Sequence, residues 1–156
     1  MNSVSPAPDL HQVNDLYDLV RLTLRLSRQF RQTLDEPFVQ ALGLNTKELL
    51  VLAAIMDGAQ TPGRVAARQQ LPAPTVTRIV TKLVAADLVQ RVPDPGDLRR
   101  CELQLTDQGK AVRSQVRGMG QDIVQAHFGQ LPPETVRSAL HALRELQGAL
   151  EARENA

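Results

Sequence analysis

Apolar side chains recur at helical spacing on two faces of a segment spanning about residues 9–33. The two faces consist of Val13, Leu16, Val20 and Leu24, and of Leu19, Leu22, Leu26 and Phe30. A helix that packs against a single surface needs only one apolar stripe. The second stripe therefore indicates either a partner chain or burial of the helix within its own domain, and the pattern leaves both alternatives open.

Two shorter helices are predicted between residues 45 and 72. Asn45 followed by Glu48 has the form of a capping box, and Gly58 can terminate the helix that starts there. Thr61 followed by Pro62 is typical of a cap and a first helical turn, so a second short helix should follow and end near residue 70. The apolar face expected for the first of these helices consists of Leu49, Leu52, Ala53 and Met56.

A third helix is predicted from about Pro74 and Thr75, with an apolar face and an opposite face of hydrogen-bonding side chains. The apolar face consists of Val76, Ile79, Val80, Leu83 and Val84, and the polar face of Thr75, Thr77, Arg78, Thr81 and Lys82. Such a division suits a helix that packs on a core and presents donors outward.

A β-hairpin and two more helices complete the pattern. Residues 89–92 are β-prone, residues 93–97 are rich in turn formers, and Leu103 and Leu105 share one face of residues 101–105. We expect a hairpin with a long tip. Thr106 should cap a helix that runs to about residue 127, and after Pro132 and Pro133 a last helix should run to about residue 153. Its apolar stripe consists of Val136, Leu140, Leu143, Leu146 and Leu150.

Helix, short helix, turn, helix and hairpin is the order of a winged helix-turn-helix, whose helix after the turn enters the major groove of DNA. The predicted fold is therefore mainly α-helical with a small β-hairpin wing. The expected organisation is a disordered tail at 1–8, an N-terminal helix and connector at 9–44, the winged helix-turn-helix at 45–106, and C-terminal helices at 107–156.

Charge is concentrated in the central segment. The 156-residue chain has a net charge of only +1, yet between Gly58 and Ala86 every charged residue is basic. These residues are Arg64, Arg68, Arg78 and Lys82. A basic segment in a neutral chain favours a local contact with phosphates. No stretch approaches the roughly 20 apolar residues of a bilayer-spanning helix, and no signal peptide is recognisable, so we expect a cytoplasmic protein without membrane contact.

The polar face of the third helix has the chemistry for reading DNA. Arginine can donate two hydrogen bonds to guanine, which makes Arg78 the best candidate for base recognition. Thr75 and Thr77 can contact phosphates or bases, while Lys82 and Arg64 are expected to bind phosphates. Taken singly, such charges more often only solvate an exposed face. Their place in a winged helix-turn-helix favours the functional interpretation.

The order and spacing of residues 43–109 resemble the core of the MarR family of bacterial transcription regulators. The most specific part is Asp97-Leu98-Arg99 followed by Leu105-Thr106 and Gly109. The other matching residues are Gly43-Leu44-Asn45, Glu48, Val51-Leu52, Val65-Ala66, Pro74-Thr75-Val76-Thr77-Arg78, Leu83, Leu88-Val89 and Arg91.

The resemblance implies a homodimer formed by the first and last two helices, and a wing that places Arg99 in or beside the minor groove. Asp97 would hold the Arg99 guanidinium or the wing backbone. The family often has arginine where Leu98 stands, and Arg100 can substitute for it from the neighbouring position. The family's usual glycine before Leu88 is Asp87 here, a residue that tolerates the left-handed conformation.

The resemblance further implies a repressor of a palindromic operator that a small-molecule effector releases. No residue identifies that effector; His11, Arg21 and Arg25 could lie near its pocket, but solvation explains them at least as well. The alternative function is a winged-helix module for protein association. Cys101 is expected to be structural rather than a redox sensor, and neither a metal site, a cofactor nor catalysis is expected, because no suitable cluster or motif occurs.

Overall fold

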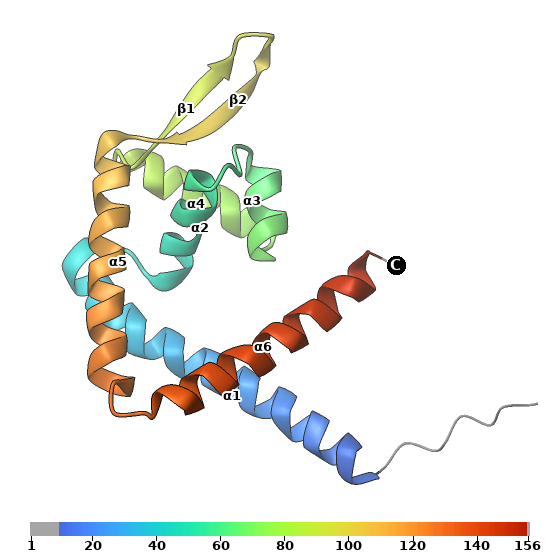
Figure 1. The fold of residues 1–156 in the computed structure, drawn as a ribbon. Coiled ribbons are helices and arrows are strands. Elements are labelled where there is room, and N and C mark those ends of the chain that lie inside the picture. The colour runs from blue at the N-terminus through green and yellow to red at the C-terminus, as the bar shows by residue number, and fades with distance from the viewer. Residues whose placement is uncertain (1–9, 156) are drawn as a thin grey trace, which may run out of the picture. The chain divides into compact units, whose positions relative to one another are not determined.

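The computed structural model describes residues 10–155, so the tail predicted at 1–8 lies outside the described residues. The chain forms two compact units, Met1–Arg117 and Gly118–Ala156. Figure 1 shows the elements, which are mostly helical and include one two-stranded hairpin. The mainly helical fold with a hairpin wing is therefore confirmed.

The first helix, α1 (Leu10–Leu42), continues through Pro37 and is longer than predicted. Proline usually interrupts a helix because it lacks an N–H donor. Here tertiary contacts keep the following turn helical: Phe38 is buried in the core, and the Asp35 carboxylate accepts a hydrogen bond of 2.6 Å from the Thr46 amide. The helix ends at Gly43, whose positive φ of 68° is the left-handed conformation that glycine adopts readily.

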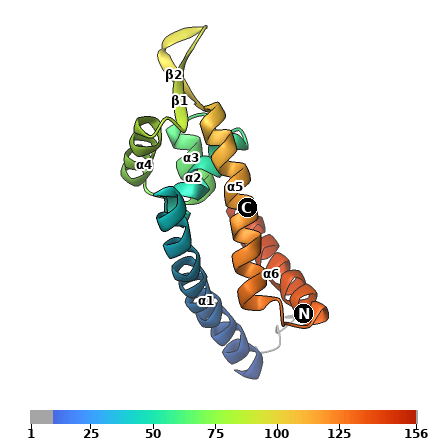
Figure 2. The same ribbon diagram turned by 90° about the vertical axis from the view of Figure 1, so that its left-hand side faces the viewer.

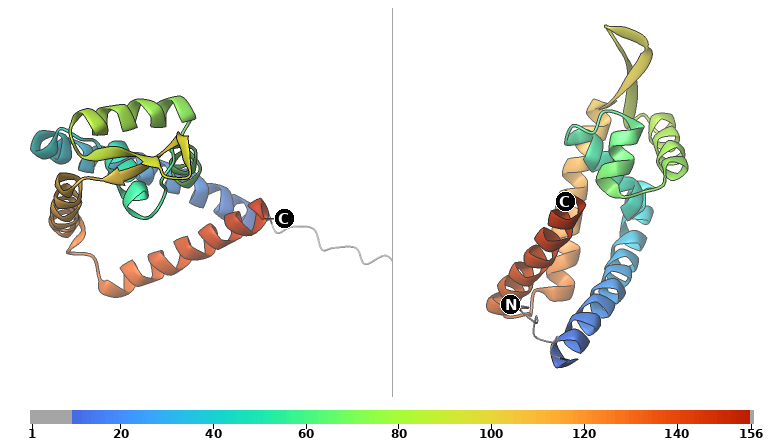
Figure 3. Two further views of the ribbon diagram at one scale, coloured as in Figure 1. Left: turned by 90° about the horizontal axis from the view of Figure 1, so that it is seen from above. Right: turned by 90° about the vertical axis from the view of Figure 1, so that its right-hand side faces the viewer.

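Three short helices enclose the core of the first unit: α2 (Thr46–Met56), α3 (Pro62–Gln69) and α4 (Ala73–Ala85). The capping box at Asn45 is present, with reciprocal hydrogen bonds to Glu48 of 2.9 Å each, and the Thr61 hydroxyl caps α3. The predicted face of α2 is wrong at one position, because Met56 is 56% exposed while Val51, Ala54 and Ile55 are buried. The inward face predicted for α4 is buried, apart from the half-buried Val84. Figures 2 and 3 show α4 at the edge of this unit, outside α2 and α3.

The wing consists of β1 (Val89–Asp94) and β2 (Asp97–Leu105), which pair antiparallel. The tip is shorter than predicted, since Asp94 pairs with Asp97 and only Pro95 and Gly96 lie between the strands. The register shifts between Pro93, which pairs with Cys101, and Asp94, so residues 98–100 form a bulge near the tip. At the base, Leu103 and Leu105 are buried as predicted, and the Leu103 amide donates to the Gln60 carbonyl.

The last two helices are α5 (Asp107–Phe128) and α6 (Pro133–Glu154). Thr106 caps α5 as predicted, since its hydroxyl accepts from the Gly109 amide and donates to the Asp87 carbonyl. The predicted helix α6 is present, but none of its residues is buried, and Leu140 and Leu143 of its apolar stripe are exposed. Among the described residues no single helix is long and apolar enough to cross a membrane; α1 and α2 pass that test of length and composition only as a bent pair.

Candidate nucleic-acid interface

The outward face of α4 carries a guanidinium group that has no partner among the described residues. Arg78 is exposed, and its side chain forms no hydrogen bond or ion pair with any residue that the structure describes. The fixed inward face of α4, with Val76, Ile79 and Leu83 buried, determines that Arg78 points away from the core. An arginine in this position can donate its full set of hydrogen bonds to a ligand.

The threonines on this face are less available as donors than the sequence suggests. The Thr77 hydroxyl donates to the Ala73 carbonyl at 3.1 Å, and the Thr81 hydroxyl donates to the Thr77 carbonyl at 2.9 Å. Thr75 is half-buried. In this conformation Thr77 offers a partner its methyl group and its oxygen lone pairs, because its one hydroxyl hydrogen is already used.

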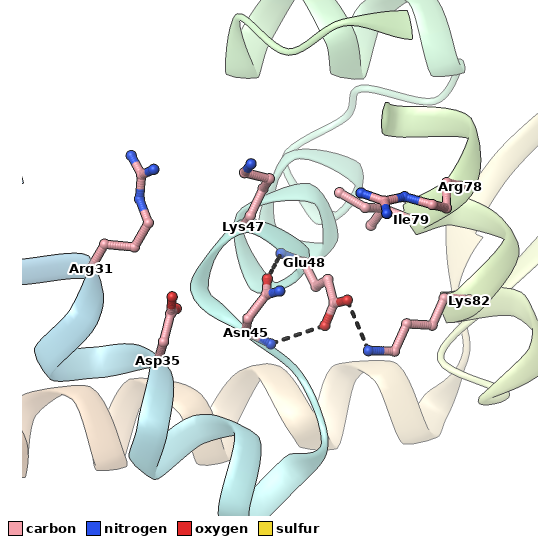
Figure 4. A pocket seen from close by; sticks show the side chains of 8 residues that line it. All are labelled: Arg31, Asp35, Asn45, Lys47, Glu48, Arg78, Ile79 and Lys82. Carbon is pink, nitrogen blue, oxygen red and sulfur yellow. Dashed lines mark hydrogen bonds and ion pairs between the residues drawn. The ribbon is translucent and has the colours of Figure 1, made fainter. Parts of the chain in front are cut away.

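Lys82 lies on the same helix but bonds within the protein. Its Nζ is 2.8 Å from Glu48 Oε1 and donates to the Gly43 carbonyl at 3.1 Å. Figure 4 shows Lys82 turned toward the start of α2, where Glu48 also takes part in the capping box with Asn45. A phosphate contact by Lys82 remains a prediction, and at most one of its three N–H donors is uncommitted for it.

At the wing tip, Asp97 organises the backbone rather than the side chain of Arg99. Its Oδ1 accepts from the Arg99 amide at 3.0 Å, and its Oδ2 lies 3.8 Å from Nε of Arg100. Of the two arrangements expected for Asp97, the structure therefore has the backbone contact. The guanidinium of Arg99 forms no hydrogen bond or ion pair with the part of the chain that is described. Leu98 is 86% exposed beside it.

Arg64 lies in the first turn of α3, and its backbone amide donates to the Thr61 cap. Its side chain lines a hollow of about 440 Å³ between the start of α3 and the wing, together with Arg100 and Cys101. Cys101 is a free, exposed cysteine. By contrast, the neighbouring Arg68 donates to the Asp57 carbonyl at the end of α2, so it has a structural partner. No group of residues suited to hold a metal ion occurs among the described residues.

A second hollow, of about 330 Å³, lies where α1, α2 and α4 meet. Arg31 of α1 and Lys47 of α2 line it together with Arg78 and Lys82 (Figure 4). Sequence reasoning missed Arg31 and Lys47. No local signal distinguishes Arg31 or Lys47, because only the fold brings these two cations beside α4.

Known proteins are similar to the winged helix-turn-helix segment and to much of the rest of the chain. The family model for the MarR family matches residues 42–100. An HTH-type transcriptional regulator of Mycobacterium bovis is 29% identical over 85% of this chain and 90% of its own length. The HTH-type transcriptional repressor NicR of Pseudomonas putida is 28% identical over 72% of this chain and 70% of its own.

A mutant of MarR from Escherichia coli, solved in complex with operator DNA, has a TM-score of 0.72 and 26% identity over 89% of this chain and 99% of its own. Residues 42–100 thus match the MarR family of transcription regulators, and the fold is similar to the winged helix fold of solved MarR proteins. Members of the MarR family are DNA-binding regulators rather than enzymes.

The part matched by the MarR family model contains every residue predicted to contact DNA. These residues are Arg64, Thr75, Thr77, Arg78, Lys82, Asp97, Arg99 and Arg100. The structure brings them onto α3, α4 and the wing of the first unit. Arg31, which lines the hollow beside α4, lies outside the matched segment.

Proposed function

We propose that this protein is a homodimeric MarR-family repressor that binds a palindromic operator and is released by a small-molecule effector. The proposal is carried by two guanidinium groups without a partner in residues 10–155, those of Arg78 on α4 and Arg99 on the wing. In the proposed complex, α4 lies in the major groove with Arg78 at base edges, while the wing brings Arg99 to the minor groove. A narrow minor groove concentrates negative potential, and arginine is more weakly hydrated than lysine, so it is the cheaper cation to insert there.

The homodimer is supported by apolar side chains that the single chain leaves in solvent. Leu16 and Val20 of α1 are each 51% exposed, and Leu140 and Leu143 of α6 are 45% and 47% exposed. Regular apolar stripes of this kind are typical of helices that pack against a partner. A two-fold dimer presents two copies of α4, which explains why a palindrome with half-sites about 34 Å apart is the proposed target.

The repressor role and operator type draw on the relatives. NicR is named a repressor, and the E. coli MarR mutant was solved with operator DNA. The test is a binding titration of the purified protein on the DNA upstream of its own gene, at several salt concentrations. Contacts with phosphates require an affinity that falls steeply with salt. Weak binding that does not change with salt would favour the alternative, a winged-helix module for protein association.

Single substitutions distinguish the base-reading role proposed for Arg78 from the sequence-independent contact proposed for Arg99. We expect Arg78→Ala to weaken binding and to relax base preference at one position of each half-site, by about 1 to 3 kcal/mol. Arg99→Ala should weaken binding to all sequences and lower the salt slope by about 1. Arg153→Ala, an exposed arginine in the last turn of α6, is the matched control and should change neither. Equal base discrimination by Arg78→Ala and the unchanged protein would remove Arg78 from base reading.

Release by an effector requires a ligand that prefers the dimer whose recognition helices are wrongly spaced for DNA. Such a ligand must raise the melting temperature of the free protein and lower operator affinity in the same concentration range. Arg21, one of the residues predicted near the effector pocket, packs over the Tyr17 ring at 5.7 Å, so it does not identify the chemistry of the effector. A compound that stabilises the protein and leaves operator affinity unchanged would not be the effector.

A further inference from the structure

A polar network joins three helices at the point where α1 ends and α2 begins. Asp35 of α1 accepts from the Thr46 amide, and Glu48 in the first turn of α2 accepts from the Asn45 amide. Lys82 of α4 then donates both to Glu48 Oε1 at 2.8 Å and to the Gly43 carbonyl at 3.1 Å. Lys82 therefore connects α4 to the junction between α1 and α2, although it lies 34 positions away from Glu48 in the sequence.

The burial of Glu48 makes the contact with Lys82 more than a surface ion pair. The side chain of Glu48 is 11% exposed and that of Lys82 is 50% exposed. A carboxylate with so little solvent needs hydrogen-bond donors to replace lost water, and the Asn45 amide and Lys82 supply them. Moving the ammonium group to a DNA phosphate would leave Glu48 with the backbone donor and a desolvated charge. The geometry therefore favours Lys82 staying on Glu48 when DNA binds.

We propose that Lys82 is a positioning residue that holds α4 at a set angle to the α1–α2 junction, rather than a residue that binds phosphate. The inference rests on the proposed function, in which each copy of α4 enters a major groove. In that function the apolar stripes of α1 and α6 join the two chains, and these helices are called the dimer frame. With α4 held to the end of α1 through Gly43 and Glu48, the angle of the helix relative to the frame is fixed. The contact then determines which spacing of half-sites the dimer accepts.

The first experiment uses Glu48→Gln in the full chain. A glutamine oxygen can still accept from the Asn45 amide, because glutamine serves in capping boxes as glutamate does, so the start of α2 stays capped. The change removes the ion pair and one negative charge from the side of the protein that faces DNA. If charge alone mattered, every duplex would bind more tightly. The positioning role instead predicts operator affinity about three- to tenfold weaker, with no loss on a scrambled duplex.

The preference for correctly spaced half-sites can be measured separately, because a loss of protein stability would weaken binding to all spacings alike. Operators with one base pair inserted or deleted between the half-sites rotate the two grooves against each other. We expect the unchanged protein to reject them, and Glu48→Gln to show a ratio of correct to incorrect spacing that is reduced about threefold or more. A thermal melt with unchanged cooperativity checks that Glu48→Gln is folded.

Lys82→Met keeps the apolar stem and removes the charge. For a positioning residue, the salt slope of operator binding should equal that of the unchanged protein, and the double variant with Glu48→Gln should bind no worse than Lys82→Met alone. The inference is overturned if Lys82→Met lowers the slope by about 1 while Glu48→Gln binds the operator as tightly as, or more tightly than, the unchanged protein. A failure of the proposed function is seen separately, as absence of selective binding by the unchanged protein.

Discussion

The winged helix-turn-helix and the helix α6 show opposite relations between apolar pattern and burial. In the described chain, the buried hydrophobic side chains lie between Phe38 and Leu105, and Leu52, Val65 and Leu83 are completely buried. In α6, an equally regular stripe leaves Leu140 and Leu143 almost half exposed. A periodic apolar pattern thus predicts that a face will be covered, but it does not say whether the chain covers that face itself.

The N-terminal caps of the helices also differ. Side chains cap α2, α3 and α5 through Asn45, Thr61 and Thr106. The N-caps of α4 and α6 are Pro72 and Pro132, and neither makes a side-chain cap hydrogen bond. The uncapped α4 is held by its buried apolar face, whereas α6 has neither a side-chain cap at its start nor a buried residue. The predictions below test this difference.

The largest effect is expected from a cavity in the core of the winged unit. Leu83 is completely buried on α4. Leu83→Ala should lower the free energy of unfolding by about 3 kcal/mol, because the lost side chain leaves a cavity between tightly packed helices. Urea unfolding at fixed protein concentration measures it. Leu98→Ala, on a side chain 86% exposed at the wing tip, is the control; an equal loss there would mean that the effect does not depend on burial.

A charge on the α6 stripe should instead act on association. Leu140→Glu should raise the dimer dissociation constant by about 100-fold, since the partner surface would have to bury a carboxylate. Far-ultraviolet circular dichroism should show that the fold is kept. Analytical ultracentrifugation measures the constant. Ser138→Glu places the same charge on the exposed opposite face of α6 and should leave association unchanged; equal dissociation by both variants would remove the stripe from the interface.

Most of what the sequence predicted correctly depends on neighbours within one or two helical turns. The capping box at Asn45, the cap at Thr106 and the inward face of α4 follow from spacings of three or four residues. The end of α1 was predicted wrongly: the helix continues past Pro37 to Leu42, where Phe38 is buried in the core and Asp35 bonds to Thr46. No local pattern shows those two contacts.

In the candidate site, too, the sequence predicted what helical periodicity determines and missed contacts between distant residues. Arg78 was placed correctly on the outer face of α4, since helical periodicity fixes that face. The contact of Lys82 with Glu48 and Gly43 spans 34 and 39 residues, and the ion pair of Asp97 with Arg100 depends on a bulge near the wing tip. Distances of this kind follow from the packing of helices and strands, which a single sequence does not display.

A smaller effect is expected at the cap of α5, where one hydroxyl makes two contacts. Thr106 accepts from Gly109 and donates to the Asp87 carbonyl at 2.6 Å, which joins the end of α4 to the start of α5. Thr106→Ala should lower the free energy of unfolding by about 1.5 kcal/mol. Thr81→Ala removes a hydroxyl that bonds only to its own helix, at Thr77, and should cost nothing measurable. Equal losses would mean that the cap adds no anchoring.

The smallest effect concerns the turn after α4. Asp87 there has a positive φ of 59°, a conformation that glycine adopts more readily than other residues. Alanine is disfavoured in this left-handed region, so Asp87→Ala should lower the free energy of unfolding by about 1 kcal/mol. Glycine has no such penalty but loses more chain entropy on folding, so Asp87→Gly should stay within about 0.5 kcal/mol of the unchanged protein. Chemical denaturation of the two variants side by side measures the difference. Alanine and glycine giving the same stability would show that neighbouring contacts, rather than backbone preference, hold this turn.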